Sequence, residues 1–316
     1  MNDSPYRPVA LTAALTGGDV LPSQTPYLPK GAVAIADAAV AAAEAGATCV
    51  HIHGRDEQGR PSADPKLFEQ IAGSIRSRSD VVINITTGGA PGMSVEDRLV
   101  GVRAVKPEIA TFNLGTMNYE PFPNPDRWPQ VSSDWERAEL ENTGNGTFVN
   151  TLSTLRLFGS TLAELGVTPE LEAYDLGHIN MARFLLDEGT LAGPVRLQLV
   201  LGVLGGAGKT VEDIVLLASA ARRILGDDLG SLGVATVGFP AEFRAAAVAF
   251  SMGMDCRVGL EDNLRSRRDR VAESNAELVE VAVTLADALA RPIEQPDELR
   301  ARLGPWAAGR GSVVAP

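Results

Sequence analysis

Two histidines separated by one residue, His51 and His53, carry the clearest chemical signal in this sequence. They end an apolar segment with the composition of a β-strand, and residues i and i+2 of a strand point to the same face. Two imidazoles and a carboxylate, with one open position, form the usual ligand set of a catalytic zinc ion. We expect a metal site rather than two core histidines, because two of the chain's 3 histidines share this strand end. The residues alone leave four candidates for the third ligand: Asp19, Asp56, Glu172 and Glu261.

A second group of ionisable residues lies near the end of the last predicted strand. Arg257 faces inward from an apolar segment, where an unpaired guanidinium would be costly. It is either a partner of Asp262 in acid/base or anion chemistry or one half of a structural ion pair, and the two interpretations are compatible. Glu261 can reach the histidine pair, because the eighth strand of a closed barrel is next to the first and the first is next to the second.

Two glycine-containing turns have patterns that suggest anion binding, and one pattern is a stronger indication than the other. The turn from Thr86 through Gly89 offers hydroxyl and backbone N–H groups that suit a carboxylate, although an ordinary helix start would look the same. The segment Gly208-Lys209-Thr210 resembles the end of a phosphate-binding loop. That pattern requires a glycine where this chain has Val203, so we expect a simple helix start there.

Short apolar segments alternate with longer segments of helical period along the whole chain. Strands are expected at 9–16, 48–53, 81–86, 109–114, 171–174, 196–201, 232–237 and 255–258. Helices are expected at 31–45, 65–77, 94–105, 147–165, 179–188, 211–225, 242–251 and 264–290, with the arginines at 265, 267, 268 and 270 on a solvated helix face. Eight strand–helix units predict an α/β protein, a single (β/α)8 TIM barrel over residues 1–316.

Functional groups of such a barrel gather at the carboxyl ends of its strands, where the polar residues described above lie. A segment rich in Pro, Asn, Trp and acidic residues, about 118–145, interrupts the alternation after the fourth strand. We expect this insertion to lie over the mouth of the barrel as a lid or as an oligomer contact. We find no linker that would divide the chain into separate domains.

Composition and charge exclude several classes of partner. The 316 residues include 28 Lys and Arg against 40 Asp and Glu, a net charge of −12, which argues against nucleic acid or an anionic membrane as the main partner. Cys49 and Cys256 lie in apolar segments and are expected to be buried thiols. We see no signal peptide and no span long enough for a bilayer, so we expect a cytoplasmic protein.

Seven of the eight strand ends carry segments that together resemble one known family. They are TAALTGG, EAGAxxVHIHxRD, INITTGG, NLGTMN, LEAYDxGHI, LGVLGG and CRVGLEDN. With these segments the chain resembles the β-keto acid cleavage enzymes, typified by the 3-keto-5-aminohexanoate cleavage enzyme. The resemblance implies a zinc-dependent TIM barrel, often a homotetramer. Such enzymes convert a 3-oxo acid and acetyl-CoA into acetoacetate and a new acyl-CoA.

The resemblance also assigns roles to single residues. It places His51, His53 and Glu261 on the zinc ligands, Asp262 with Arg257 on the acid/base pair, and Asp19 on an acidic position near the metal where relatives commonly have a longer glutamate. It places the polar end of the keto acid at Thr87 and Thr111, beside Gly88 and Gly89, and Glu172 where an amino group at the distal end can be recognised. In the implied mechanism zinc polarises the 3-keto oxygen and Asp262 removes a proton from C2.

Three other functions are open to the same residues. A metal-dependent aldolase or lyase acting on a carboxylic acid would share the barrel, the metal and the enolate, and only its independence of CoA would distinguish it. An amidohydrolase needs further histidines on later strands, and only His178 is available. A non-catalytic binding barrel predicts that replacing His51 leaves ligand affinity intact.

Overall fold

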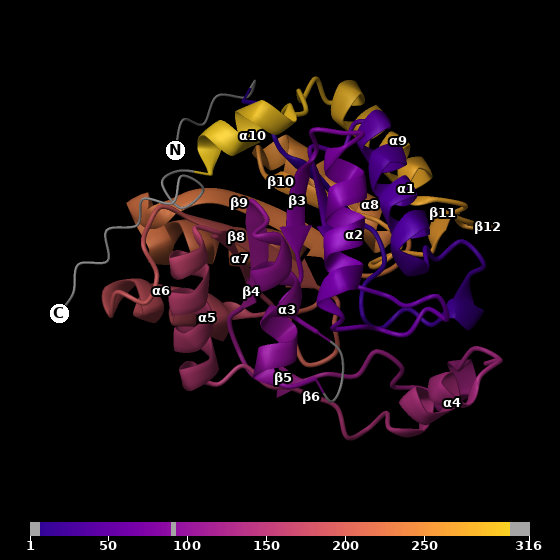
Figure 1. Ribbon diagram of the computed structural model, residues 1–316. Coiled ribbons are helices and arrows are strands. Elements are labelled where there is room, and N and C mark those ends of the chain that lie inside the picture. The colour runs from indigo at the N-terminus through magenta and orange to yellow at the C-terminus, as the bar shows by residue number, and fades with distance from the viewer. Residues whose placement is uncertain (1–6, 90–92, 304–316) are drawn as a thin grey trace.

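Eight strands form a closed parallel barrel at the centre of the computed structural model, which describes residues 7–89 and 93–303 (Figure 1). Around the barrel the order is β1-β10-β9-β8-β7-β4-β3-β2, so each strand pairs with its neighbour along the chain and β10 closes onto β1. The barrel strands are β1 (Leu11–Ala14), β2 (Cys49–Ile52), β3 (Val82–Ile85), β4 (Ile109–Asn113), β7 (Thr168–Ala173), β8 (Val195–Leu201), β9 (Leu229–Thr236) and β10 (Asp255–Val258). The predicted (β/α)8 barrel is confirmed.

Helices cover the outside of the barrel, and several of them begin at a recognisable cap. Asp64 caps α2 ahead of Pro65, and Thr210 forms a capping box with Asp213 at α7, so the phosphate-loop-like segment is a helix start as predicted. The helices are α1 (Gly31–Glu44), α2 (Pro65–Arg76), α3 (Val95–Val105), α5 (Leu152–Leu165), α6 (Leu176–Asp187), α7 (Val211–Leu225), α8 (Ala241–Met252), α9 (Asn275–Ala288) and α10 (Pro296–Arg302). None of the helices in the described part of the chain is long and apolar enough to cross a membrane.

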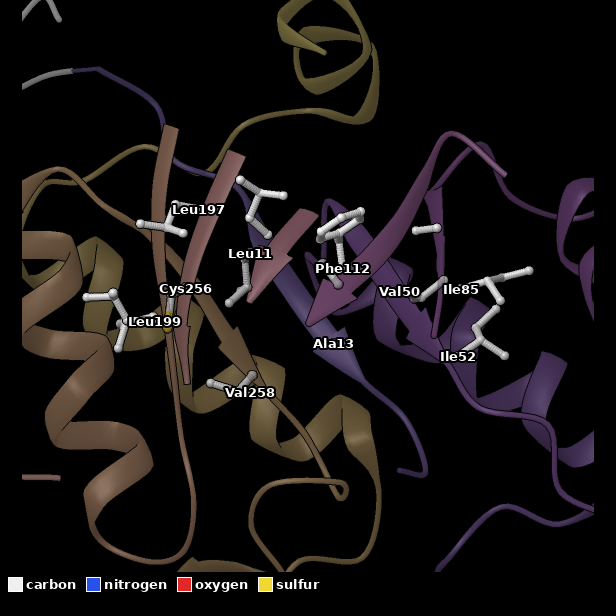
Figure 2. Packing of buried hydrophobic residues seen from close by; sticks show 14 of the residues in the cluster. Leu11, Ala13, Val50, Ile52, Ile85, Phe112, Leu197, Leu199, Cys256 and Val258 are labelled. Carbon is white, nitrogen blue, oxygen red and sulfur yellow. The ribbon is translucent and has the colours of Figure 1, made fainter. Parts of the chain in front are cut away.

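The apolar core lies between the barrel and its helices. Leu11, Ala13, Leu197 and Leu199 alternate along their strands and pack outward into this layer, as Figure 2 shows. The residues between them are polar in several strands, and their side chains bond across the barrel interior. Cys49 and Cys256 are both buried and free, as expected.

The segment after β4 forms a separate excursion at the carboxyl ends of the strands (Figure 1). It contains β5 (Met117–Asn118), η2 (Pro125–Arg127), α4 (Asp134–Glu141) and β6 (Thr147–Phe148). β5 and β6 pair antiparallel, with Met117 opposite Phe148, so the two ends of the excursion lie together. This is the insertion predicted at 118–145, and its function as a lid stays a prediction.

Two predicted helices were wrong at their amino-terminal ends. Residues 264–290 do not form one helix, because β11 (Arg265–Arg267) and β12 (Arg270–Val271) make a hairpin before α9 begins. Ser266 is buried between exposed Arg265 and Arg267, which is the period of a strand rather than of a solvated helix face. The helix predicted from 147 begins at Leu152, because Thr147 and Phe148 belong to β6.

Candidate active site at the carboxyl ends of the strands

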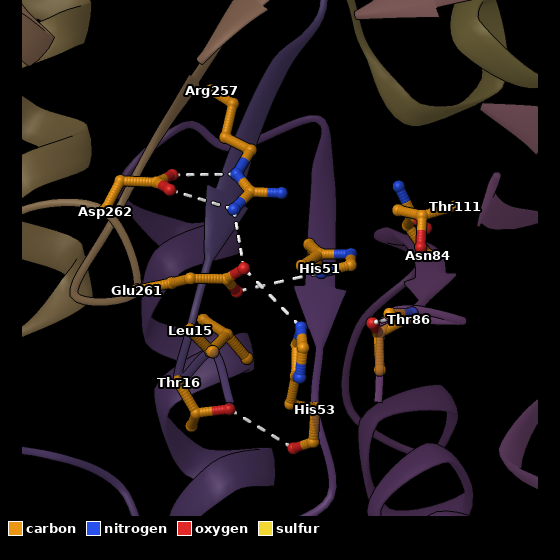
Figure 3. A network of polar contacts seen from close by, with 12 residues as sticks. Leu15, Thr16, His51, His53, Asn84, Thr86, Thr111, Arg257, Glu261 and Asp262 are labelled. Atoms are coloured by element: carbon orange, nitrogen blue, oxygen red, sulfur yellow. Dashed lines mark hydrogen bonds and ion pairs between the residues drawn. The ribbon is translucent and has the colours of Figure 1, made fainter. Parts of the chain in front are cut away.

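His51, His53 and Glu261 come together at the mouth of the barrel (Figure 3). Glu261 follows β10, and its backbone N–H donates to the carbonyl of Ala14 on β1, which in turn pairs with His51 on β2. A carboxylate oxygen of Glu261 lies 3.7 Å from His51 Nε2 and the other lies 3.5 Å from His53 Nε2. One ligand atom from each of the three residues lies within 4.8 Å of the others.

The chemistry of this triad fits a divalent metal ion. His51 Nδ1 and Glu261 Oε2 are buried and have no hydrogen-bond partner. Burial lowers the pKa of His51 to about 3, so its imidazole is neutral and keeps its lone pair. Burial opposes ionisation of Glu261, but the charge of Arg257 holds the pKa of its carboxyl well below the usual range. Two imidazoles and an ionised carboxylate therefore converge with electron pairs available to a cation.

Arg257 connects the triad to Asp262. Its Nε and Nη2 donate to the two carboxylate oxygens of Asp262 at 2.7 and 2.9 Å, and Nη2 also donates to Glu261 at 2.6 Å. Burial raises the pKa of Asp262 above its ordinary value, although Arg257 acts in the opposite direction. The ion pair expected from the sequence is therefore present, and it fixes the orientation of a buried carboxylate with a raised proton affinity.

Glu172, at the end of β7, is almost fully buried on the other side of Arg257. Arg257 Nη1 and Gln198 Nε2 donate to its Oε1, each at 3.4 Å, while Asn113 Nδ2 and the Tyr174 hydroxyl donate to Oε2. Burial is the main cause that raises the pKa of this carboxyl to about 7, and Arg257 opposes the rise.

Asp19 lies in the loop after β1, at the entrance to the site. Its carboxylate accepts a hydrogen bond from the hydroxyl of Tyr119, which belongs to the insertion. Burial raises the pKa of Asp19, and the Tyr119 bond and the charge of His53 counter that rise. Arg55 holds the same loop, since its guanidinium donates to the carbonyls of Gly17 and Thr16 at 3.0 and 3.2 Å.

The predicted substrate-binding turn divides into two parts. Thr87 and Thr111 are fully buried and bonded to each other, through Thr87 N to Thr111 Oγ1 at 2.9 Å and Thr87 Oγ1 to the Thr111 carbonyl at 2.7 Å. Gly88, Gly89 and the preceding Thr86 line the cavity instead. The two threonines therefore connect β3 and β4 below the turn that faces the cavity.

Asp56 and His178 lie outside this constellation. Asp56 Oδ1 accepts from the backbone N–H groups of Gln58 and Arg60 and so closes an exposed turn. His178 Nδ1 accepts the N–H of Tyr174 in the first turn of α6. Of the four candidates for the third ligand, Glu261 is the one that the structure brings against both histidines.

A cavity of about 300 Å³ opens above these residues. Its lining includes His51, His53, Glu172, Arg257 and Glu261 at the barrel end. The insertion and later strands contribute residues that were not predicted as part of the site, namely Tyr119, Phe148, Tyr174 and Val200, and α3 contributes Arg98. The polar residues Asn113 and Gln198, which contact Glu172, were also missed, although each occupies an alternate position in its strand.

The mouth of the barrel has more negative than positive charge. Arg257 is paired with Glu172, Glu261 and Asp262, and Asp19 adds a further carboxyl at the entrance. Buried carboxylates that outnumber their cations are stabilised by a bound metal ion. A barrel with this donor set and a buried carboxylate beside it defines a class of metal-dependent α/β-barrel enzymes.

Comparison with known proteins identifies the family. The sequence profile of the beta-keto acid cleavage enzymes matches residues 8–304. The chain belongs to this family, whose members act on carbon–carbon bonds. The expected resemblance is thereby confirmed.

Individual relatives match over nearly their whole length. A 3,5-dioxohexanoate:acetyl-CoA acetone transferase of Paraburkholderia graminis is 37% identical over 301 residues, covering 94% of this chain and 96% of the relative. A 3-keto-5-aminohexanoate cleavage enzyme of Fusobacterium nucleatum is 36% identical over 292 residues, 92% of this chain and 95% of the relative. The apo structure of ObcA superposes with a TM-score of 0.70 at 19% identity, covering 89% of this chain and 66% of ObcA, and so shares the fold.

Proposed function

We propose that the protein is a zinc-dependent β-keto acid cleavage enzyme that exchanges acyl groups between a 3-oxo acid and acetyl-CoA. The observation that carries the proposal is the His51–His53–Glu261 triad with the Arg257–Asp262 pair beside it in one cavity. The names of the two relatives support the substrate class, since 3,5-dioxohexanoate and 3-keto-5-aminohexanoate are both 3-oxo acids.

In this proposal, His51, His53 and Glu261 hold the metal. Zinc suits two imidazoles and one carboxylate with a position left open. When bound, it would supply a Lewis acid for the 3-keto oxygen of the substrate.

Asp262 is the proposed general base. Its carboxylate takes a proton from C2 of the 3-oxo acid, which is acidified by the neighbouring carbonyl. Arg257 donates to both of its oxygens and so limits its rotation. The raised pKa of Asp262 favours uptake of that proton. Asp19, which lines the cavity near His53, is the third proposed catalytic residue, and it acts through its charge.

The remaining steps balance without a covalent enzyme intermediate. The C2 carbanion attacks the thioester carbonyl of acetyl-CoA, the new carbon–carbon bond forms, and CoA leaves as a thiolate. The thiolate attacks the former 3-keto carbon, and cleavage between C2 and C3 releases the new acyl-CoA. The acetoacetate carbanion then takes back the proton held by Asp262. We assign the carboxylate of the acid to the turn at Gly88 and Gly89, which Thr87 and Thr111 support from below.

Metal analysis combined with a coupled assay tests this function. The purified protein should contain about one zinc per chain and should form acetoacetate only when both a 3-oxo acid and acetyl-CoA are present. Turnover of the acid without acetyl-CoA would instead identify a lyase. A metal-free protein that is still fully active would contradict the role of the triad. The homotetramer implied by the family stays a prediction, which light scattering after size-exclusion chromatography tests.

A further inference from the structure

The acceptor capacity of Glu172 is filled by the protein itself. A carboxylate offers about four lone-pair sites, two on each oxygen. Arg257 and Gln198 donate to Oε1, and Asn113 and Tyr174 donate to Oε2. The residue is 5% exposed. An ammonium group of a substrate would therefore have to displace one of these four donors before it could pair with Glu172.

Tyr174 is the donor to Glu172 that also belongs to the aromatic side of the cavity. Its hydroxyl accepts from Asn113 Nδ2 at 3.1 Å and donates to Glu172 at 3.3 Å, so both hydrogen-bonding functions of the phenol are used. Burial raises the pKa of this hydroxyl well above its ordinary value, so it keeps its proton. With a pKa of about 7, Glu172 itself is only partly ionised near neutral pH.

The wall above Glu172 is apolar and is made of aromatic rings. Phe148 lies between Tyr119 and Tyr174, with ring centroids 5.6 and 6.2 Å away, the second pair meeting edge to face. Val200 packs in the same cluster. Rings that pack on one another in this way bury their surfaces mutually and present a mainly hydrophobic surface to a ligand.

A fixed positive charge lies against this wall. The guanidinium of Arg98 is centred 5.4 Å from the ring of Phe148, and it donates to the carbonyls of Thr87 and Val149 and to the side chain of Asn150. All these acceptors are neutral, and within the described part of the chain no carboxylate forms an ion pair with Arg98. Burial lowers the pKa of Arg98 to about 10, so it remains charged at neutral pH. A second cation against Phe148 would be repelled by the first.

The two acidic groups that the insertion contributes to the cavity lining, Glu120 and Glu139, do not replace Glu172. The carboxylate of Glu120 accepts from the backbone N–H groups of Gly144 and Gly146. Glu139 lines the outer rim and is exposed, so water and salt screen its charge.

We infer that the distal substituent of the 3-oxo acid is uncharged and apolar, and that this enzyme discriminates against an ammonium group there. The inference rests on the proposed function and concerns the same cavity. It differs from the role that the family resemblance gives to Glu172, because here Glu172 serves the polar network of the barrel rather than the substrate.

Two acids that differ by one amino group test the inference directly. The metal-loaded full chain is assayed with acetyl-CoA and either 3-oxohexanoate or 5-amino-3-oxohexanoate, and kcat/KM is compared. We expect the neutral acid to be favoured at least about tenfold, the size typical of discrimination by a single buried contact. Equal or better turnover of 5-amino-3-oxohexanoate would overturn the inference. Turnover of neither acid would instead contradict the proposed function.

Tyr174→Phe sharpens the test, because it removes one donor from Glu172 without changing the shape of the ring. The preference for the neutral acid should shrink by about tenfold as Oε2 becomes available to an ammonium group. Tyr27→Phe is the matched control, since Tyr27 is 43% exposed and lies outside the cavity lining. An unchanged preference in a folded, metal-containing Tyr174→Phe protein would show that the Tyr174 hydroxyl does not keep an ammonium group from pairing with Glu172.

A third substrate distinguishes the aromatic wall from an aromatic cage. Three rings can bind a quaternary ammonium through their faces, although Arg98 already lies over one of them here. Turnover of 4-trimethylammonio-3-oxobutanoate above that of 3-oxohexanoate would mean that the rings bind a cation and would overturn the inference. We expect it to be the poorest of the three acids.

Discussion

Inside the barrel, β7, β8 and β10 each present two polar side chains, and the two layers they form differ in how their charges are matched. In the deeper layer Arg196 lies 3.2 Å from Glu170 and 3.4 Å from Asp255. Arg302 of α10 adds ion pairs of 3.1 Å to Asp255 and 2.6 Å to Glu294. Every carboxylate of this layer therefore has a cation of the protein within contact.

The upper layer is two residues further along the same strands, where Glu172, Gln198 and Arg257 lie. One guanidinium serves Glu172, Glu261 and Asp262 together. The two layers also differ in which buried polar atoms have no hydrogen-bond partner. The deeper layer leaves N–H groups of Arg196 and Arg302 without acceptors, whereas the upper layer leaves His51 Nδ1 and Glu261 Oε2 without partners. The deeper layer is a structural network, and the upper one has electron pairs in excess, which is the condition for binding a cation.

The largest effect is expected from removing a ligand of the upper layer. His51→Ala should abolish metal binding and reduce acetoacetate formation below detection, because the charge developing on the substrate loses several kcal/mol of stabilisation. Metal content by elemental analysis and kcat with saturating substrates measure the two losses. A His51→Ala protein that binds zinc and turns over normally would remove the distinction between the layers.

Asp262→Asn should leave the metal in place and still impair catalysis. Loss of a general base costs about 10²- to 10⁴-fold in kcat. Asp56→Asn is the matched control, because Asp56 closes an exposed turn outside the cavity and its substitution should change kcat less than twofold. Equal effects of the two substitutions would contradict the role of Asp262.

The deeper layer should respond in stability rather than in rate. Arg196→Met leaves Glu170 buried without its cation, and the free energy of unfolding should fall by about 3–5 kcal/mol. The exposed pair of Arg156 and Glu188 supplies the control, since Arg156→Met should cost no more than about 1 kcal/mol. Chemical denaturation measures both, and kcat per folded molecule of Arg196→Met should match the parent protein.

The smallest effect is a difference in pH dependence between the layers of the metal-free protein. Burial raises the pKa of Glu172 from 4.5 to about 7, so the folded state keeps a proton that the unfolded state loses in this window. The free energy of unfolding should therefore fall as pH rises from 4.5 to 7, by up to about 3 kcal/mol. Glu172→Gln should remove that slope, as denaturation across the window would show.

The pKa of Asp255, in the deeper layer, is shifted in the opposite direction, so its contribution to stability depends on pH in the opposite way. Burial alone would raise its pKa, but Arg302 and Arg196 hold it below 3.8, so its contribution to stability is present above that pH. The contribution should disappear as pH falls further, because protonation removes the charge that both arginines contact. A loss of stability from Asp255 on raising the pH would contradict the pairing of this layer.

The sequence was sufficient to predict the barrel and the histidine pair, because both depend on short-range patterns. It left four candidates for the third metal ligand, and only the family resemblance assigned Glu261. Eight apolar segments separated by helices leave little choice of topology, and His51-x-His53 is fixed by the alternation within one strand. The hairpin at Arg265–Val271 escaped prediction because a run of arginines also suits a solvated helix. In the structure, Asn263 bonds both the N–H and the carbonyl of Arg265, the first residue of the hairpin.

The hydrogen bonds that occupy the carboxylate of Glu172 could not be predicted in the same way. Its donors come from β4, β8, β10 and the residue after β7, and no local spacing connects them. The same is true of Thr87 and Thr111, which the sequence suggests as binding groups and which the structure bonds to each other. Residue types indicate which groups can do chemistry, and the register between strands decides which of them are already occupied.

The antiparallel pair of β5 and β6 at the base of the insertion determines where this protein can be altered. Because Met117 and Phe148 are paired, and Tyr119 N bonds the carbonyl of Gly146, the chain leaves and re-enters the barrel at almost the same place. The length between these two points can change at little entropic cost to the rest of the fold. The segment between β5 and β6 can thus be replaced as a unit. The wall of the cavity that it forms can be taken from a relative, while the barrel that carries His51, Arg257 and Glu261 is kept.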